Sequence, residues 1–236
     1  MDDFRNTGCG KIAIEVRGVG KVFPVAGSSF RALRDINLKI PEGILAILKG
    51  SSGSGKTTLL NIVGALDEPS EGSVWIDGVE TGSLTDQQKD VLRRKQMGFI
   101  FQSVSLIPSL NAYQNVEFSL RMAGIRENRK KRTEECLKMV GLGNRMYHMP
   151  AEMSGGEQQR AAIARAIAHR PKIILADEPT AELDSAMAAE VTRLFGEMVE
   201  KEHITVLMTT HDMGLMDAGS MIIELENGEQ KEWRMQ

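Results

Sequence analysis

This chain of 236 residues contains few cysteines and few aromatic residues, and neither sign of charge dominates. Its two cysteines, Cys9 and Cys136, lie far apart and lack the close spacing of a zinc site, so neither a disulfide framework nor a zinc centre is indicated. The net charge of −3 gives no reason to expect nucleic acid, because proteins that bind it usually present a basic face. These absences favour a chain from a reducing cytosol with no nucleic-acid partner.

Long hydrophobic runs are also missing. A membrane helix needs about twenty mainly apolar residues, and the longest uncharged stretch, residues 96–116, is interrupted by Gln102, Ser103, Pro108 and Asn111. Residues 1–6 lack the basic-then-apolar pattern of a secretory signal. We therefore expect no membrane-spanning segment. With 42% hydrophobic residues, the chain can bury a sizeable core as one domain.

A glycine-rich stretch, residues 50–58, lies where the pattern predicts a strand feeding a helix. The apolar run 45–48 precedes it and a helical pattern over 57–66 follows, which is the context of a phosphate-binding loop. Glycines let successive N–H groups point inward, and the helix N-terminus favours an anion. A flexible Gly/Ser linker would not need the Lys-Thr pair. The motif comprises Gly50, Ser51, Ser52, Gly53, Ser54, Gly55, Lys56, Thr57 and Thr58.

The motif predicts a nucleoside triphosphate as ligand. Lys56 is expected to reach the β- and γ-phosphates, and the Thr57 hydroxyl to hold a magnesium ion that bridges them.

Apolar strands alternate with helical patterns through the rest of the chain. Strands this uniformly apolar favour a parallel sheet covered on both faces, and hence an α/β fold. Residues 103–153 show helical periodicity and are expected to form a helical insertion. Further strands are expected at 11–16, 34–40, 73–78, 97–101, 173–176, 205–209 and 221–225, and helices at 85–95, 154–169 and 185–200, with a short helix from Asp212 and a last hairpin after Asn227-Gly228.

Two adjacent carboxylates, Asp177 and Glu178, end the strand 173–176. Such a pair can be a solvated turn. Beside a phosphate loop, however, Asp177 is expected to support the magnesium ion, and Glu178 to accept a proton from an attacking water, which accelerates a reaction by about 10²- to 10⁴-fold.

A second anion site is indicated at Ser154, Gly155, Gly156 and Glu157. Ser154 and Glu157 fit a capping box, which would serve any helix. Capping does not explain the two glycines, which leave bare N–H groups at a positive helix end. The chain thus carries two predicted phosphate sites, and one nucleotide explains only the first.

The order of these motifs, with Gln102, Asp184 and His211, resembles the ATP-binding-cassette (ABC) ATPases from Phe23 to Gly228. The resemblance implies a P-loop NTPase fold of ABC type: a mostly parallel core sheet, an N-terminal antiparallel β subdomain and an inserted helical subdomain. It implies a single domain, with a nucleotide-binding core at 1–102 and 159–236 and a helical subdomain at 103–158.

The family also implies a head-to-tail dimer. The phosphate loop of one copy and Ser154-Gly155-Gly156 of the other would enclose each ATP, which accounts for the second anion site. By resemblance, Phe23 stacks on adenine, Gln102 contacts magnesium and the water, Asp184 makes a dimer contact and His211 touches the γ-phosphate. Lys56, Gln102, Glu178 and His211 are thus the candidate catalytic residues, and Thr57, Gln102 and Asp177 the candidate magnesium residues.

Five positions depart from the usual family pattern. Phe23 stands where tyrosine is usual and could instead belong to the core, Met153 replaces leucine, Glu157 replaces glutamine, and Ala181-Glu182 precedes Leu183-Asp184. Methionine for leucine conserves volume. Glu157 brings a negative charge near the phosphates, and this charge is partly neutralised if Glu157 caps its own helix.

Within the family, residues 61–67, 99–103 and 106–110 look most like the bacterial branch of lipoprotein-releasing, macrolide-exporting and antimicrobial-peptide-resistance ATPases. That branch implies an ATPase at the cytoplasmic face of the cell membrane, driving a separate membrane permease that exports or extracts a peptide, lipoprotein or drug. The alternative is an ATP switch that regulates a membrane or nucleic-acid partner without transport.

Two features of the insertion have open interpretations. Met122, Met139, Met146, Met149 and Met153 are expected either to fill the core or to form an adaptable surface for a partner helix. The basic run 126–132 is expected to be a solvated helix start, with weak attraction to anionic lipid as the alternative.

Overall fold

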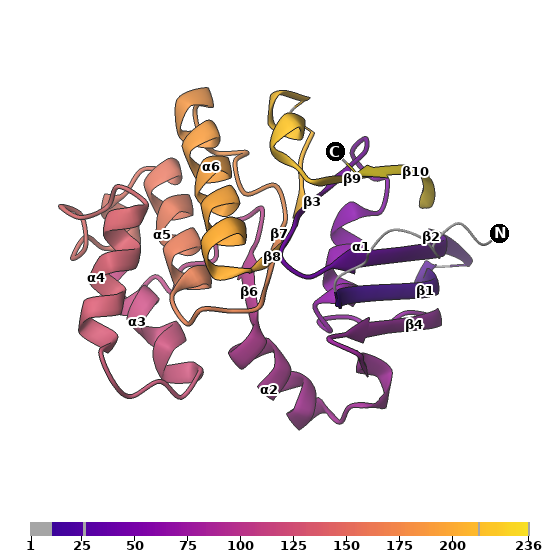
Figure 1. Cartoon of the computed structure of the whole chain (residues 1–236), viewed down its shortest axis with the longest axis horizontal. Coiled ribbons are helices and arrows are strands. Elements are labelled where there is room, and N and C mark those ends of the chain that lie inside the picture. The colour runs from indigo at the N-terminus through magenta and orange to yellow at the C-terminus, as the bar shows by residue number, and fades with distance from the viewer. Residues whose placement is uncertain (1–10, 26, 212, 236) are drawn as a thin grey trace.

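Two β-sheets pack against each other in the computed structural model, which describes residues 11–25, 27–211 and 213–235 (Figure 1). The expectations for Cys9, for the N-terminal residues 1–6 and for Asp212 lie outside these residues. In the described part of the chain, no helix is both long and apolar enough to cross a bilayer.

The first sheet is antiparallel, with the strand order β2-β1-β4-β5. Its inward residues alternate with exposed ones, because one face packs on the core and the other meets water. The two long strands extend well past the runs expected from the sequence, because their hairpin ends are largely exposed and do not show the buried-exposed alternation of the inner parts. The strands are β1 (Ile12–Val25), β2 (Ser28–Pro41), β4 (Glu71–Ile76) and β5 (Val79–Glu80).

The second sheet has the order β10-β9-β3-β8-β7-β6, and all its strands are parallel except β10 at the edge. Its central strands are buried on both faces, which explains their continuous apolar runs. The strands are β3 (Leu45–Lys49), β6 (Met97–Ile100), β7 (Ile173–Ala176), β8 (Thr205–Thr209), β9 (Met221–Glu226) and β10 (Glu229–Met235).

Helices α3, α4, α5 and α6 lie on one side of the second sheet, and α1 and the antiparallel sheet lie on the other (Figure 1). Capping boxes at Thr85 and Asn111 start α2 and α3. The helices are α1 (Lys56–Val63), α2 (Asp86–Gln96), α3 (Ala112–Met122), α4 (Arg129–Met139), α5 (Gly155–Ile167) and α6 (Ser185–Glu202), with short 3-10 turns at Thr81–Ser83, Pro150–Glu152 and Met213–Ala218.

The hydrophobic core is divided by the second sheet. Along β3, Ile47 belongs to the cluster under α3 to α6, whereas Ala46 and Leu48 belong to the cluster under the antiparallel sheet and α1. This alternation anchors β3 in both clusters, and the phosphate loop follows directly from its end. Residues 45–49 therefore hold the loop on a rigid element.

The helical insertion is less continuous than its periodicity suggests. Residues 103–111 form no helix, and α3 and α4 are joined by a turn at residues 123–128. The expected boundary between residues 158 and 159 falls inside α5, which is one helix that contacts α3, α4 and β6. Met146 and Met153 are buried, as expected of core residues, whereas Met122 and Met139 are exposed, and their role as a partner surface stays a prediction.

The basic run forms the start of α4 and is mostly exposed, as expected of a solvated helix start. Arg132 is the exception, because its guanidinium donates to the carbonyl oxygens of Ile167 and Ala168 at the end of α5.

Candidate functional site

The phosphate loop connects β3 to α1, and two of its glycines, Gly50 and Gly55, could not be replaced by another residue without strain. Gly55 caps α1 with φ 103°, and a Cβ there would lie 2.9 Å from the carbonyl oxygen of Ala32. A Cβ on Gly50 would lie 2.3 Å from the carbonyl oxygen of Leu225. The loop is therefore locked against β2 and β9, and the N-terminus of α1 opens onto it without a side chain in the way.

Lys56, the first residue of α1, turns its ammonium group back into this loop. Its Nζ donates to the carbonyl oxygens of Gly50 (2.8 Å) and Ser51 (2.9 Å), and the residue is only 6% exposed. A buried positive charge enclosed by loop backbone is suited to bind phosphate oxygens. The Ser54 hydroxyl, also buried in the loop, has no hydrogen-bond partner within the described residues.

Asp177 joins the phosphate loop to the end of β7. The Thr57 hydroxyl donates to Asp177 Oδ2 at 2.7 Å, and the Thr209 hydroxyl at the end of β8 donates to Asp177 Oδ1 at 2.7 Å. A threonine hydroxyl and a carboxylate are hard oxygen donors of the kind that Mg²⁺ takes together with substrate phosphates. Thr57 and Asp177 therefore fit a magnesium site.

Glu178 lies where three parallel strands end. Its carboxylate Oε2 is 3.4 Å from Gln102 Nε2, which follows β6, and 3.4 Å from His211 Nδ1, which follows β8. Its backbone is left-handed, with φ 46°, and its N–H donates to the Thr209 hydroxyl at 2.8 Å. The carboxyl ends of parallel strands thus gather Gln102, Glu178 and His211 beside the phosphate loop, as expected of an α/β site.

The second predicted anion site lies at the start of α5. Ser154 caps the helix by accepting the N–H of Glu157 (3.3 Å), and the Glu157 carboxylate accepts the N–H of Ser154 (2.9 Å). The capping box of the sequence is thus confirmed. The backbone hydrogen bond from Ser154, helped by the charge of Arg145 at 3.5 Å, lowers the pKa of Glu157. The charge of Glu157 is thereby engaged within its own helix start.

Gly156 packs against the segment that leads into α6. A Cβ on Gly156 would lie 3.3 Å from Leu183 Cδ2 and 3.4 Å from the carbonyl oxygen of Glu182. Asp184 caps α6 by accepting the N–H of Met187 at 3.0 Å. The N-terminus of α5 therefore packs against the segment that leads into α6. The residues predicted to face the second copy, Gly156 and Asp184, lie at these two helix starts.

Phe23 is an exposed residue of β1 and does not belong to either buried cluster. It is 36% exposed, and Lys21 Nζ lies 5.0 Å from the centre of its ring. Phe23 is therefore not a buried core residue, and its stacking on adenine stays a prediction.

This arrangement matches known proteins. The model of the ABC transporter family matches residues 33–181, which is more than half of the chain. The chain belongs to the ABC transporter family.

Relatives of this family cover nearly the whole chain. An uncharacterised ABC transporter ATP-binding protein of Methanocaldococcus jannaschii, MJ0796, is 45% identical over 221 residues, which are 92% of this chain and 94% of that protein. The macrolide export ATP-binding/permease protein MacB of Bartonella henselae is 43% identical over 215 residues, 91% of this chain but 32% of MacB.

A solved structure of MJ0796, described as a dimeric post-hydrolysis state bound to ADP and phosphate, superposes with a TM-score of 0.91 and 41% identity. It covers 94% of this chain and 98% of the other. The chain is therefore an ABC ATPase with ATP as its substrate and Mg²⁺ as its cofactor.

An apolar groove lies on the ABC cassette between α2, the end of β6 and α3, with a cavity of about 550 Å³. The exposed rings of Phe101 and Phe118 line it together with Met122. Arg165 of α5 also lines it and donates to the carbonyl oxygen (2.6 Å) and hydroxyl (3.1 Å) of Ser105. The segment that carries Gln102 thus borders both the site and this groove.

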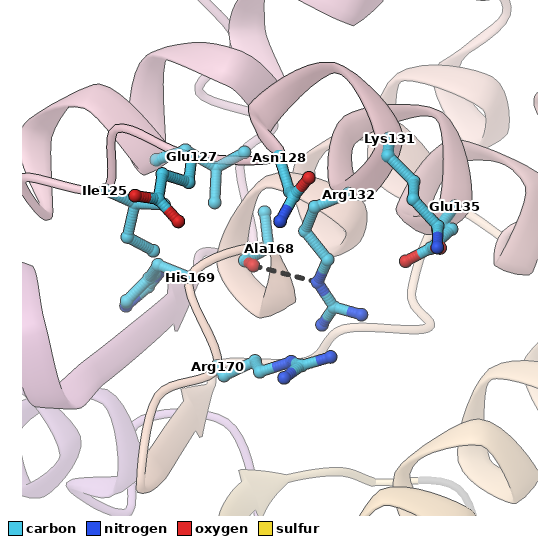
Figure 2. A pocket seen from close by; sticks show the side chains of 10 residues that line it. Ile125, Glu127, Asn128, Lys131, Arg132, Glu135, Ala168, His169 and Arg170 are labelled. Carbon is cyan, nitrogen blue, oxygen red and sulfur yellow. Dashed lines mark hydrogen bonds and ion pairs between the residues drawn. The ribbon is translucent and has the colours of Figure 1, made fainter.

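Figure 2 shows a smaller hollow of about 360 Å³ between α4, the turn before it and the residues that follow α5. Its lining carries charges of both signs, from Lys131 and Arg170 and from Glu127 and Glu135. Lys131 Nζ lies 3.9 Å from Glu135 Oε1, and the Arg132 guanidinium donates hydrogen bonds to the end of α5. None of the predicted site residues lines it. The nucleotide is therefore not expected there.

Sequence reasoning missed two residues of the site. Thr209 holds both Asp177 and the backbone of Glu178, and Arg145 pairs with Glu157. A hydroxyl residue at the carboxyl end of a strand that neighbours Asp177 was the available signal for Thr209. Arg145 gave no such signal, because it lies in an irregular stretch.

Proposed function

We propose that two copies of this chain close around two ATP molecules and thereby move a separate membrane permease. The observation that carries the proposal is the presence of two anion sites on one chain, at the phosphate loop and at Ser154–Gly156, of which one nucleotide explains only the first. In a two-fold pair, each surplus site completes the pocket of the other copy. The dimeric MJ0796 structure supports this arrangement.

Hydrolysis is assigned to the residues that gather at the strand ends. Glu178 accepts the proton of the attacking water, and Lys56 neutralises phosphate charge. Gln102 contacts the magnesium ion and the water, and His211 contacts the γ-phosphate; both side chains lie 3.4 Å from the Glu178 carboxylate. Thr57 and Asp177 hold the magnesium ion, which when bound neutralises charge on the β- and γ-phosphates. Thr209 positions Glu178 and Asp177 through its two hydrogen bonds.

The remaining predicted residues bind the adenine base or lie at the contact between the two copies. Phe23 stacks on adenine, Ser154, Gly155, Gly156 and Glu157 contact the ATP held by the second copy, and Asp184 lies at the contact between copies. The exposed ring of Phe23 and the solvent-facing start of α5 support these roles.

The apolar groove is the surface for the permease, and its occupant is a cytoplasmic helix of that subunit. The aromatic and methionine side chains of the groove suit the apolar face of a helix. Arg93, Arg94 and Arg165 outnumber Asp90 along its lining, which favours a helix with acidic flanks. Fusion of an ATP-binding segment to a permease in the name of MacB supports a permease partner here.

The division of the chain follows from these roles. Residues 1–102 and 159–236 form the nucleotide-binding core, and residues 103–158 form the helical subdomain that carries the second anion site. The protein then works at the cytoplasmic face of the cell membrane, attached through its permease, and the cargo is a peptide, lipoprotein or drug.

Two substitutions test the ATPase assignment. Glu178→Gln is expected to retain ATP binding, slow turnover by about 10²- to 10⁴-fold and trap an ATP-bound dimer on gel filtration. Lys56→Ala is expected to weaken nucleotide binding and leave the protein monomeric in ATP. If Glu178→Gln hydrolyses ATP at the parent rate, or stays monomeric in saturating ATP, the proposal is contradicted.

The groove is tested by crosslinking. A photoreactive residue at position 105 is expected to label a co-purified permease, whereas one at the exposed position of Val79, on β5 of the other sheet, serves as the matched control. Equal labelling from both positions, or labelling only from the control, would remove the groove from the proposal. Tight binding of RNA or DNA at physiological salt would point to a switch without transport.

A further inference from the structure

The β1–β2 hairpin carries a second exposed aromatic residue beside Phe23. Phe30 pairs directly with Phe23 across the two antiparallel strands, and the residues are 55% and 36% exposed. Side chains of a directly opposed pair point to the same face, with their Cβ atoms about 4.5–5.5 Å apart. The two side chains therefore leave neighbouring strands on the same face of the sheet.

A bulge in β2 lies close to this pair and contacts the phosphate loop. Val22 pairs with Arg31 while Lys21 pairs with Leu33, so Ala32 is an extra residue in β2. The carbonyl oxygen of Ala32 approaches the position of a Cβ on Gly55 to 2.9 Å. The β1–β2 hairpin therefore contacts the end of the phosphate loop through Ala32. Phe30 lies two residues before Ala32 on β2.

Ion pairs fix the strands around the two rings. Lys21, whose ammonium lies over the Phe23 ring, donates to Asp67 Oδ1 (2.6 Å) and to the carbonyl oxygen of Glu68 (2.7 Å). Arg31, next to Phe30, binds the Glu71 carboxylate at 2.9 Å. The backbone on both sides is anchored, and yet neither ring is buried in a hydrophobic cluster. Such a pair is suited to be covered by a flat aromatic ligand.

We propose that Phe30 is the second aromatic residue of the nucleobase platform, and that it contributes to the affinity for ATP through its base. This inference rests on the proposed function, in which Phe23 stacks on adenine. Phe30 extends the apolar surface beyond Phe23, so that the base contacts two rings from two neighbouring strands. It takes no part in the chemistry at the γ-phosphate.

The test compares Phe30→Ala with the parent protein in steady-state ATP hydrolysis. Loss of a stacking partner is expected to raise the KM for ATP at least about fivefold, while kcat stays within about twofold because the reacting groups are untouched. Inorganic tripolyphosphate, which has no base, is expected to inhibit parent and variant equally. Val79→Ala, at another exposed apolar position of the same sheet, serves as the control and keeps the parent KM.

Two further variants guard against a folding effect. Phe30→Leu keeps an apolar side chain without a ring and is expected to raise KM, whereas Phe30→Tyr keeps the ring and restores it. An unchanged KM for ATP in Phe30→Ala and Phe30→Leu, or an equal loss of affinity for tripolyphosphate, would overturn the inference. The proposed function is tested separately, because Phe23→Ala and Glu178→Gln report on it whatever Phe30 does.

Discussion

Thr209→Val isolates the hydrogen bonds that hold the two carboxylate residues. The Thr209 hydroxyl is completely buried, donates to Asp177 and accepts the N–H of Glu178. Valine has a similar shape and leaves little cavity, so the substitution removes the two bonds and little else.

The magnitude follows from what is left unpaired. A hydrogen bond to a carboxylate contributes about 1.5–3 kcal/mol, and a buried N–H without a partner costs about 1–3 kcal/mol. Glu178 also loses the bond that holds it in the left-handed region, a conformation that costs about 1–2 kcal/mol for a residue with a side chain. We expect the free energy of unfolding to fall by about 2–5 kcal/mol, and kcat to fall by about 10- to 100-fold as Glu178 shifts.

Thr192→Val is the matched control. Thr192 is also buried, at 3% exposed, but its hydroxyl donates only to the carbonyl oxygen of Ala188 within α6. Its loss is expected to change stability by less than about 1 kcal/mol. Both variants are measured by urea unfolding followed by circular dichroism, and by ATP hydrolysis. Equal stabilities for the two variants, together with a parent kcat in Thr209→Val, would refute the positioning role.

Three other predictions concern contacts outside the strand ends. Glu157→Gln keeps an oxygen that can cap the helix, so the free energy of unfolding in urea is expected to change by less than about 1 kcal/mol. Adding Arg145→Ala to this variant is expected to cause no further loss of stability. A further loss in the double variant would contradict the ion pair between Arg145 and Glu157. Asp77, bound by two lysines, has a pKa lowered to about 2. Asp77→Asn is therefore expected to lower the free energy of unfolding at pH 7 by about 1 kcal/mol, and the difference should disappear as the pH falls from about 4 to 2; a loss that persists at pH 2 argues against an ionic cause. Arg165→Ala removes the two hydrogen bonds to Ser105. It is expected to reduce ATP hydrolysis in the permease complex by about 2- to 30-fold and to leave ATP hydrolysis by the isolated protein unchanged. Equal effects in the complex and in the isolated protein would show that Arg165 does not act through the permease.

Much of the fold could be predicted from the sequence because local patterns and global packing agree. The apolar runs that became β7 and β8 are buried on both faces, and their bounds match the expected residues. The expected helical insertion includes residues 103–111, although Ser103, Pro108 and Asn111 argue against a continuous helix there, and the structure shows that the first helix of the insertion begins at Ala112. The helix expected at residues 154–169 is found as α5, and it runs without a break across the division that family resemblance implies between residues 158 and 159.

The candidate site divides in the same way. The phosphate loop, Asp177 and Glu178 carry sequence signals, because a glycine pattern and an acidic pair at a strand end are local features. The left-handed backbone of Glu178 and its support by Thr209 depend on the pairing of β7 with β8, which no local pattern fixes. The bulge at Ala32 likewise depends on register between strands and not on composition.

The aromatic pair is carried by the antiparallel sheet, whereas the carboxylates and the phosphate loop are carried by the parallel one. Preference among nucleotides and the speed of bond cleavage can therefore diverge independently during evolution. Under the proposed nucleobase platform, substitutions at positions 23 and 30 would change the nucleotide preference and leave the residues of hydrolysis unchanged.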